Sequence, residues 1–79
     1  MTRDEAMKLI GAALDATTPG LSAKVTEASD LIGENLVDSL DSMNFLFELE
    51  TLFGRKLTAI DESFSDFRVS KLIDILVEA

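Results

Sequence analysis

The chain has 79 residues, a formal net charge of −8 and a pI near 4.2, and it contains no cysteine, histidine, tryptophan or tyrosine. Disulfides, thiolate metal sites and histidine-based acid–base catalysis are therefore excluded. Such an acidic surface repels nucleic acid phosphates and anionic lipids, so neither is an expected partner, and basic protein surfaces are its natural complement.

The length predicts a single small domain over residues 1–79. The apolar content of 47% is too high for a disordered acidic segment. The longest apolar run is far shorter than a membrane span, and the first five residues do not resemble a signal peptide. We therefore expect a cytoplasmic protein that is monomeric and has no membrane span.

The first predicted helix covers residues 3–16. Thr2 and Glu5 have the spacing of a capping box, in which each side chain satisfies the backbone N–H of the other residue. Apolar residues then recur with helical spacing. Pro19 and Gly20 are strong helix breakers, so the helix is expected to end before residue 17.

Residues 17–38 lack a clean helical period and predict a long loop. A short helical turn near residues 27–32 would reduce the length of irregular chain, which is unusual in so small a domain. The expected anchors of this loop in the core are Val25, Leu31, Ile32, Leu36 and Val37.

The clearest helix is predicted at residues 39–53. Asp38 is a good N-cap, Asp41 puts a carboxylate in the positive first turn, and Gly54 is a typical C-terminal stop. Apolar residues cover a broad arc of this helix and leave one polar face. That face consists of Asp41, Asn44, Glu48 and Thr51.

Residues 57–61 are predicted to form an extended connector, followed by a short helix at 62–66 and a last helix at 69–78. Arg68 is a poor capping residue for this last helix. The chain has no β-type alternation. The predicted fold is therefore all-α, a small four-helix bundle with three longer helices, one short helix III and a long loop between helices I and II.

No catalytic residue and no metal site are predicted, and we do not expect an enzyme. A Ser-His-Asp arrangement is impossible without histidine. The stretch from Asp38 to Asn44 is faintly similar to a calcium loop but lacks its glycine and its distal glutamate. Gly33 and Gly54 are isolated, so no phosphate-binding loop is present.

Ser39 is the residue that the pattern singles out. Serine is common in the first turn of a helix for structural reasons alone. However, a helix N-terminus is also a favourable place for a phosphate group. The stretch from Leu31 to Met43, LIGENLVDSLDSM, resembles the phosphopantetheine attachment site of acyl carrier proteins. The matching positions after the serine are Leu40, Met43, Leu46, Leu49, Phe53 and Leu57, and with the length and acidity the resemblance covers essentially the whole chain.

This resemblance implies that a phosphopantetheinyl transferase moves 4'-phosphopantetheine from coenzyme A to the hydroxyl of Ser39. The arm would carry acyl or aminoacyl groups as thioesters and present them to partner enzymes. These partners would be an acyl- or aminoacyl-loading ligase and downstream transferases with basic surfaces. Ser42, in the string Asp-Ser-Met, is a rival attachment site, but choosing it shifts every later match by three residues and places the serine inside the helix.

Partner recognition is expected around Ser39, because residues 25–54 contain seven acidic residues and no basic one. The candidate recognition residues are Asp38, Leu40, Asp41, Met43, Glu48 and Glu50. The alternative is that these charges only keep the domain soluble.

The apolar excess of the second helix also has two explanations. Phe45 and Phe47 point about 200° apart, so they cannot share one core direction. Ordinary helix packing is one explanation. The other is a cavity for the carried group, lined by Met43, Leu46, Leu57 and Phe67.

The carried group and its pathway stay open. Asn44 and Thr51 stand where carriers of fatty acid synthesis usually have acids, and Leu36-Val37-Asp38 is more similar to carriers of aminoacyl or specialised acyl groups. The alternative function is an acidic helical protein–protein interaction module without a prosthetic group.

Overall fold

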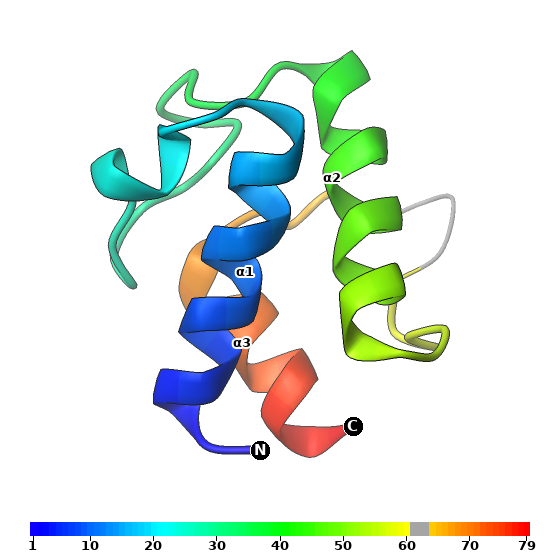
Figure 1. Cartoon of the computed structure of the whole chain (residues 1–79). Coiled ribbons are helices and arrows are strands. Elements are labelled where there is room, and N and C mark those ends of the chain that lie inside the picture. The colour runs from blue at the N-terminus through cyan, green and yellow to red at the C-terminus, as the bar shows by residue number, and fades with distance from the viewer. Residues whose placement is uncertain (61–63) are drawn as a thin grey trace.

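The computed structural model describes residues 1–60 and 64–79, and its regular structure is helical (Figure 1). It contains α1 (Arg3–Thr17), the short 3-10 turn η1 (Leu21–Lys24), α2 (Ser39–Phe53) and α3 (Val69–Glu78). The described residues form no β-strand, only an isolated antiparallel bridge between Asp30 and Arg68. The predicted all-α class is confirmed.

The predicted four-helix bundle is not confirmed. Of the expected short helix at 62–66, residues 62 and 63 lie outside the described residues, and residues 64–66 are not helical. Asp66 instead holds Arg68 in a local ion pair with N–O distances of 2.6 and 2.8 Å. The three α-helices and the turn η1 are the helical elements of the described chain.

The boundaries of α1 follow from side-chain caps. Thr2 Oγ1 accepts a hydrogen bond from the Glu5 N–H at 3.1 Å, and Glu5 Oε1 accepts one from the Thr2 N–H at 2.8 Å. The predicted capping box is therefore present. The helix ends one residue later than predicted, where the Thr17 hydroxyl donates to the Leu14 carbonyl at 3.0 Å.

The boundaries of α2 are those that the sequence predicted. Asp38 Oδ1 accepts a hydrogen bond from the Asp41 N–H at 2.7 Å, which fixes the first turn. Gly54 ends the helix with φ of 91°, a left-handed conformation that glycine adopts without strain, and its N–H donates to the Glu50 carbonyl. At α3, Arg68 forms no side-chain cap, as expected.

The long loop contains helical structure at Leu21–Lys24 and not at the predicted residues 27–32, which form turns and the bridge to Arg68. The cause is a contact with α1, because the Asp15 carboxylate accepts hydrogen bonds from the Ser22 N–H (3.0 Å) and hydroxyl (2.7 Å). The hydrogen bonds from the Ser22 N–H and then from its hydroxyl stabilise the ionised carboxylate and so lower the pKa of Asp15.

Two backbone hydrogen bonds hold the loop against the start of α3. The Leu31 N–H donates to the Phe67 carbonyl at 3.0 Å, and the Val69 N–H donates to the Ser29 carbonyl at 2.9 Å. Of the expected loop anchors, Val25, Leu31 and Val37 are buried and Leu36 is half-buried; Ile32 is exposed, so its prediction as an anchor was wrong.

The connector after α2 also differs from the prediction. The Ile60 N–H donates to the Leu57 carbonyl at 3.0 Å, so these residues form a turn and not an extended segment. Asp61, the last residue of the predicted connector, lies outside the described residues. Leu57 and Ile60 are both buried, which draws this turn onto the end of the helical core.

The core lies between the three helices, with α1 packed against both α2 and α3. Its largest fully buried side chains come from all three helices, the long loop and the connector. They are Phe45, Ile10, Leu14, Leu31, Leu49, Leu57, Leu72, Ile73, Leu76 and Val69.

Candidate functional site

Ser39 is the first residue of α2 and is exposed. Asp38, the N-cap, adopts an extended backbone with φ of −86° and ψ of 175°, and its side chain holds the first turn. The Ser39 hydroxyl forms no hydrogen bond to any residue that the structure describes.

The backbone around Ser39 offers hydrogen-bond donors. The Asp41 N–H is taken by Asp38 Oδ1, and the Ser42 N–H donates to the Asp38 carbonyl at 2.9 Å. The N–H groups of Ser39 and Leu40 have no acceptor among the described residues. Since the helix dipole is positive at this end, the environment of these N–H groups favours negative charge.

Ser42 has a different environment. The residue is 4% exposed, and its hydroxyl donates to the Ser39 carbonyl at 2.7 Å. An enzyme that modifies this hydroxyl would have to break the hydrogen bond and open the first turn of α2. The two serines are therefore three residues apart but differ sharply in accessibility.

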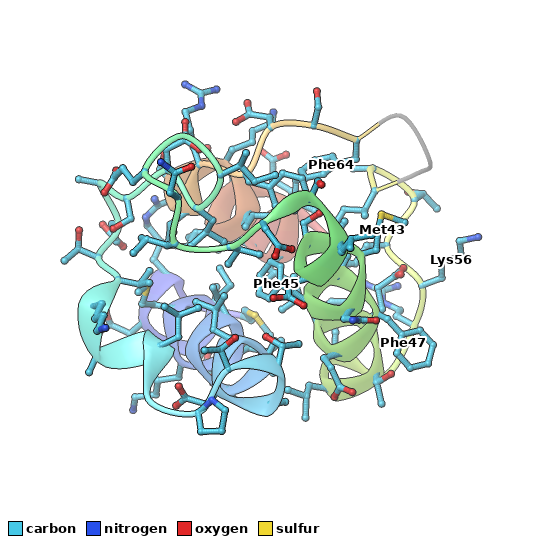
Figure 2. The ribbon with its side chains drawn as sticks, turned by 90° about the horizontal axis from the view of Figure 1, so that it is seen from above. Met43, Phe45, Phe47, Lys56 and Phe64 are labelled. Atoms are coloured by element: carbon cyan, nitrogen blue, oxygen red, sulfur yellow. The ribbon has the colours of Figure 1, made fainter. Side chains whose placement is uncertain are left out.

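An exposed apolar stripe starts beside Ser39. It consists of Leu40, Met43 and Phe47, which are 80%, 57% and 68% exposed. Their spacing puts them on one face of α2. Figure 2 shows Met43 and Phe47 directed outward, whereas Phe45 lies between α2 and the rest of the core. Leu40 and Met43, two of the candidate recognition residues, are therefore on the surface of the domain.

The acidic candidates are distributed around the same helix. Asp38 is exposed, and Asp41, Glu48 and Glu50 are half-buried. Glu50 Oε2 accepts a hydrogen bond from the Leu57 N–H at 2.6 Å. This carboxylate therefore has a structural role in closing the turn after α2, in addition to its charge.

The four residues that were predicted to line a cargo cavity do not surround a common cavity. Leu46, Leu57 and Phe67 are each less than 5% exposed and belong to the common core, while Met43 lies outside it. Leu57 lines a groove beyond the C-terminal end of α2, and the other three do not. Ordinary packing accounts for Leu46 and Phe67.

Sequence reasoning missed Phe47 and the groove beyond α2. The sequence could have indicated Phe47, because residues seven positions apart, such as Leu40 and Phe47, lie on the same face of a helix. The groove depends on the turn after α2 meeting α3, and no local pattern marks that contact.

The described residues contain no group of three or more acidic side chains that could hold a metal ion. Within the same part of the chain, none of the helices combines the length and the apolar character needed to cross a membrane. Comparison of the chain with protein-family models, curated proteins and solved structures gave no significant match to any of them.

Proposed function

We propose that this chain is a carrier domain that holds acyl or aminoacyl groups as thioesters on a 4'-phosphopantetheine arm attached to Ser39. The observation that carries the proposal is the contrast between two neighbouring serines. Ser39 is exposed at the positive end of α2, and Ser42 is buried and hydrogen-bonded. The resemblance of residues 31–43 to a carrier attachment site supports the same serine.

The role of the chain is to present a hydroxyl and to hold the product. The cap formed by Asp38 keeps the first turn of α2 closed, so that the Ser39 oxygen stands clear of the core. In this proposal the transferase supplies the base that activates this oxygen, since the chain lacks histidine, the commonest general base. The arm, when attached, supplies a thiol that carries the cargo. The free N–H groups of Ser39 and Leu40 would stabilise the phosphate.

Partner enzymes would recognise charge and apolar surface together. Residues 25–54 carry seven acidic side chains and no basic one, so their field attracts basic surfaces. Leu40 and Met43 offer exposed apolar area one and four residues after Ser39. A phosphopantetheinyl transferase, a loading ligase and downstream transferases would all dock near this end of α2.

A second function is an interaction module without a prosthetic group. The stripe formed by Leu40, Met43 and Phe47 favours it, because an exposed apolar face can bind a partner whether or not Ser39 is modified. In that case, partner binding would not change when Ser39 is replaced by alanine.

The test is intact-mass spectrometry after incubation with coenzyme A, magnesium and a promiscuous phosphopantetheinyl transferase. We expect the wild-type chain and the matched control Ser42→Ala to gain one phosphopantetheinyl group, and Ser39→Ala to gain none. No gain in the wild type, while a known carrier in the same tube is modified, would refute the carrier function. A gain in Ser39→Ala would show that another residue bears the arm.

A further inference from the structure

The exposed apolar stripe of α2 leads into an open hollow at the C-terminal end of the same helix. The hollow has a volume of about 380 Å³. Its described lining is Phe47, Glu50, Thr51, Gly54, Arg55 and Lys56. Phe47 belongs to both the stripe and the hollow. One face of α2 therefore carries raised apolar side chains at its beginning and a hollow at its end.

The stripe and the hollow are arranged evenly about Phe47. Leu40 comes seven residues before Phe47 and Gly54 comes seven residues after it, which is about 10.5 Å in each direction at 1.5 Å per residue. Seven residues are close to two full turns, so the three positions share one face. Met43 and Thr51 lie four residues to either side of Phe47 on the same face.

The two ends of this face are complementary in shape. Leu40 is 80% exposed, so its side chain projects from the domain. At Gly54, an added Cβ would meet no heavy atom of the described residues within 4 Å, so the space beside this residue is open. A second copy related by a two-fold axis at Phe47 would place Leu40 of each copy over Gly54 of the other. A two-fold dimer requires a self-complementary surface of this kind.

The charges on the face are compatible with such a pairing. The stripe itself is uncharged, and Asp41 and Glu48 point about 120° and 100° away from Phe47 around the helix. Exposed Asn44 and half-buried Glu50 are each three residues from Phe47, so antiparallel pairing sets them opposite each other. The Asn44 amide would then donate a hydrogen bond to the Glu50 carboxylate.

The two ends of α2 are also complementary in charge. Asp38 and Asp41 lie at its acidic beginning, and Arg55 and Lys56 follow its end. Figure 2 shows Lys56 extending into solvent. Antiparallel pairing brings the basic end of each copy beside the acidic end of the other and sets the two helix dipoles in opposite directions. Repulsion between the net charges of −8 is screened beyond about 8 Å at physiological salt, whereas attraction at the contact persists.

We propose that this face of α2 binds a second copy of the chain in an antiparallel, two-fold dimer. The stripe offers roughly 400 Å² per copy, or about 800 Å² for the pair, which is less than the roughly 1,200 Å² of a standard interface. The dimer is therefore weak, with a dissociation constant of about 0.1–1 mM, and the monomer prevails in dilute solution. The dimer covers the Ser39 end of each copy, so it competes with any protein that docks there. The inference does not rest on the proposed carrier function.

The test is sedimentation equilibrium of the full chain from about 20 μM to about 2 mM in about 150 mM NaCl, with two-dimensional NMR of the ¹⁵N-labelled chain over the same range. We expect the average mass to rise from 8.6 kDa toward twice that value. The amide shifts should depend on concentration and be centred on Leu40, Met43, Phe47 and Gly54.

Two pairs of matched variants test the contact. Phe47→Ala should weaken association at least about tenfold, because Phe47 lies on the axis. Leu52→Ala should leave it unchanged, because Leu52 is 45% exposed on the same helix but points about 140° away from Phe47. Lys56→Glu should weaken association roughly three- to tenfold, and Lys24→Glu, at an exposed lysine off this face, should not. Circular dichroism checks that the variants stay folded.

The orientation of the two copies is tested separately. The chain has no cysteine, so a nitroxide can be attached at Thr58→Cys, an exposed position near the basic end. An unlabelled chain carrying the nitroxide is mixed with ¹⁵N-labelled wild type, so that broadening reports only contact between copies. Antiparallel pairing should broaden the amides of Ser39 and Leu40, whereas parallel pairing would broaden those of residues 54–58.

Several results would overturn the proposal. These are an average mass that stays at 8.6 kDa, broadening confined to residues 54–58, or equal effects within either pair of matched variants. Ser39→Ala should dimerise like the wild type, although it is expected to gain no phosphopantetheinyl group. The dimer and the carrier function can therefore fail independently.

Discussion

Phe45 and Phe47 provide a stringent test of the helix orientation, because they are the same residue type two positions apart in α2. Phe45 is 0% exposed and Phe47 is 68% exposed. A buried phenylalanine removes roughly 150–250 Å² from water, which at about 25 cal/mol per Å² corresponds to roughly 4–6 kcal/mol. Replacement of a core phenylalanine by alanine typically costs about 3–5 kcal/mol.

This cost is large for a chain of 79 residues, whose total stability is expected to be about 4–12 kcal/mol. We therefore expect Phe45→Ala to remove at least about a quarter of the free energy of unfolding, and Phe45→Leu to lower it by roughly 1–2 kcal/mol. Phe47→Ala should change the free energy of unfolding by less than about 0.5 kcal/mol, because its ring leaves no cavity.

The assay is urea and thermal unfolding followed by far-UV circular dichroism, since the chain has neither tryptophan nor tyrosine to report by fluorescence. A loss of 1 kcal/mol should lower Tm by about 4–8 °C in a domain of this size. Equal effects of Phe45→Ala and Phe47→Ala, or a larger effect at position 47, would show that α2 buries a different face.

Three further predictions concern local features. Asp38→Ala should cost about 1 kcal/mol by removing the cap of α2, and Asp38→Asn should restore most of it, as measured by urea unfolding. Gly54→Ala should lower the free energy of unfolding by about 1 kcal/mol, because φ is 91° at this residue. Gly11→Ala should raise it by about 0.5–1 kcal/mol, because the added methyl group meets only Ser22 Cβ, at 3.4 Å. Equal changes in the two variants would contradict this reasoning. The Arg68 side chain lowers the pKa of Asp66 from 3.8 to about 2, so the stabilisation from this pair is fully present above pH 3.8 and is lost as the pH falls through about 2. Arg68→Gln should return the Asp66 titration midpoint, followed by carboxyl ¹³C NMR, toward 3.8, and an unchanged midpoint would exclude Arg68 as the cause.

The helices were predictable because their ends carry local signals. Thr2 and Glu5 form a reciprocal cap, Asp38 caps α2, and Gly54 ends it, and each of these interactions spans four residues or fewer. The boundaries of α2 match the prediction for this reason, whereas those of α3 match without a side-chain cap and follow from its apolar periodicity. Local chemistry of this kind can be read without knowledge of the tertiary structure.

The irregular segments were not predictable in the same way. The turn η1 depends on Asp15 reaching Ser22, and the turn after α2 depends on Glu50 reaching Leu57, both across seven residues. Periodicity also could not decide which part of the apolar arc of α2 stays exposed. That choice is made by the position of α1 and the core, which leave Leu40 and its stripe uncovered.

The sequence predicted that a helix starts at Ser39, and the structure adds that this residue is exposed to solvent. The choice between Ser39 and Ser42 rested on the register of the later matches and on the position of Ser42 inside the helix, and the structure adds that Ser42 is buried and hydrogen-bonded. The attachment of an arm stays a prediction.

The pair of hydrogen bonds between residues 29–31 and 67–69 links the loop before α2 to the start of α3. Leu31 also accepts hydrogen bonds from the N–H groups of Leu36 and Val37, both at 2.9 Å, and Val37 directly precedes the cap of α2. A continuous backbone path therefore runs from the first turn of α3 to Ser39. Amide hydrogens of Leu31, Val37 and Val69 should exchange with solvent as one cooperative unit, so that loosening α3 also releases the segment that orients the serine.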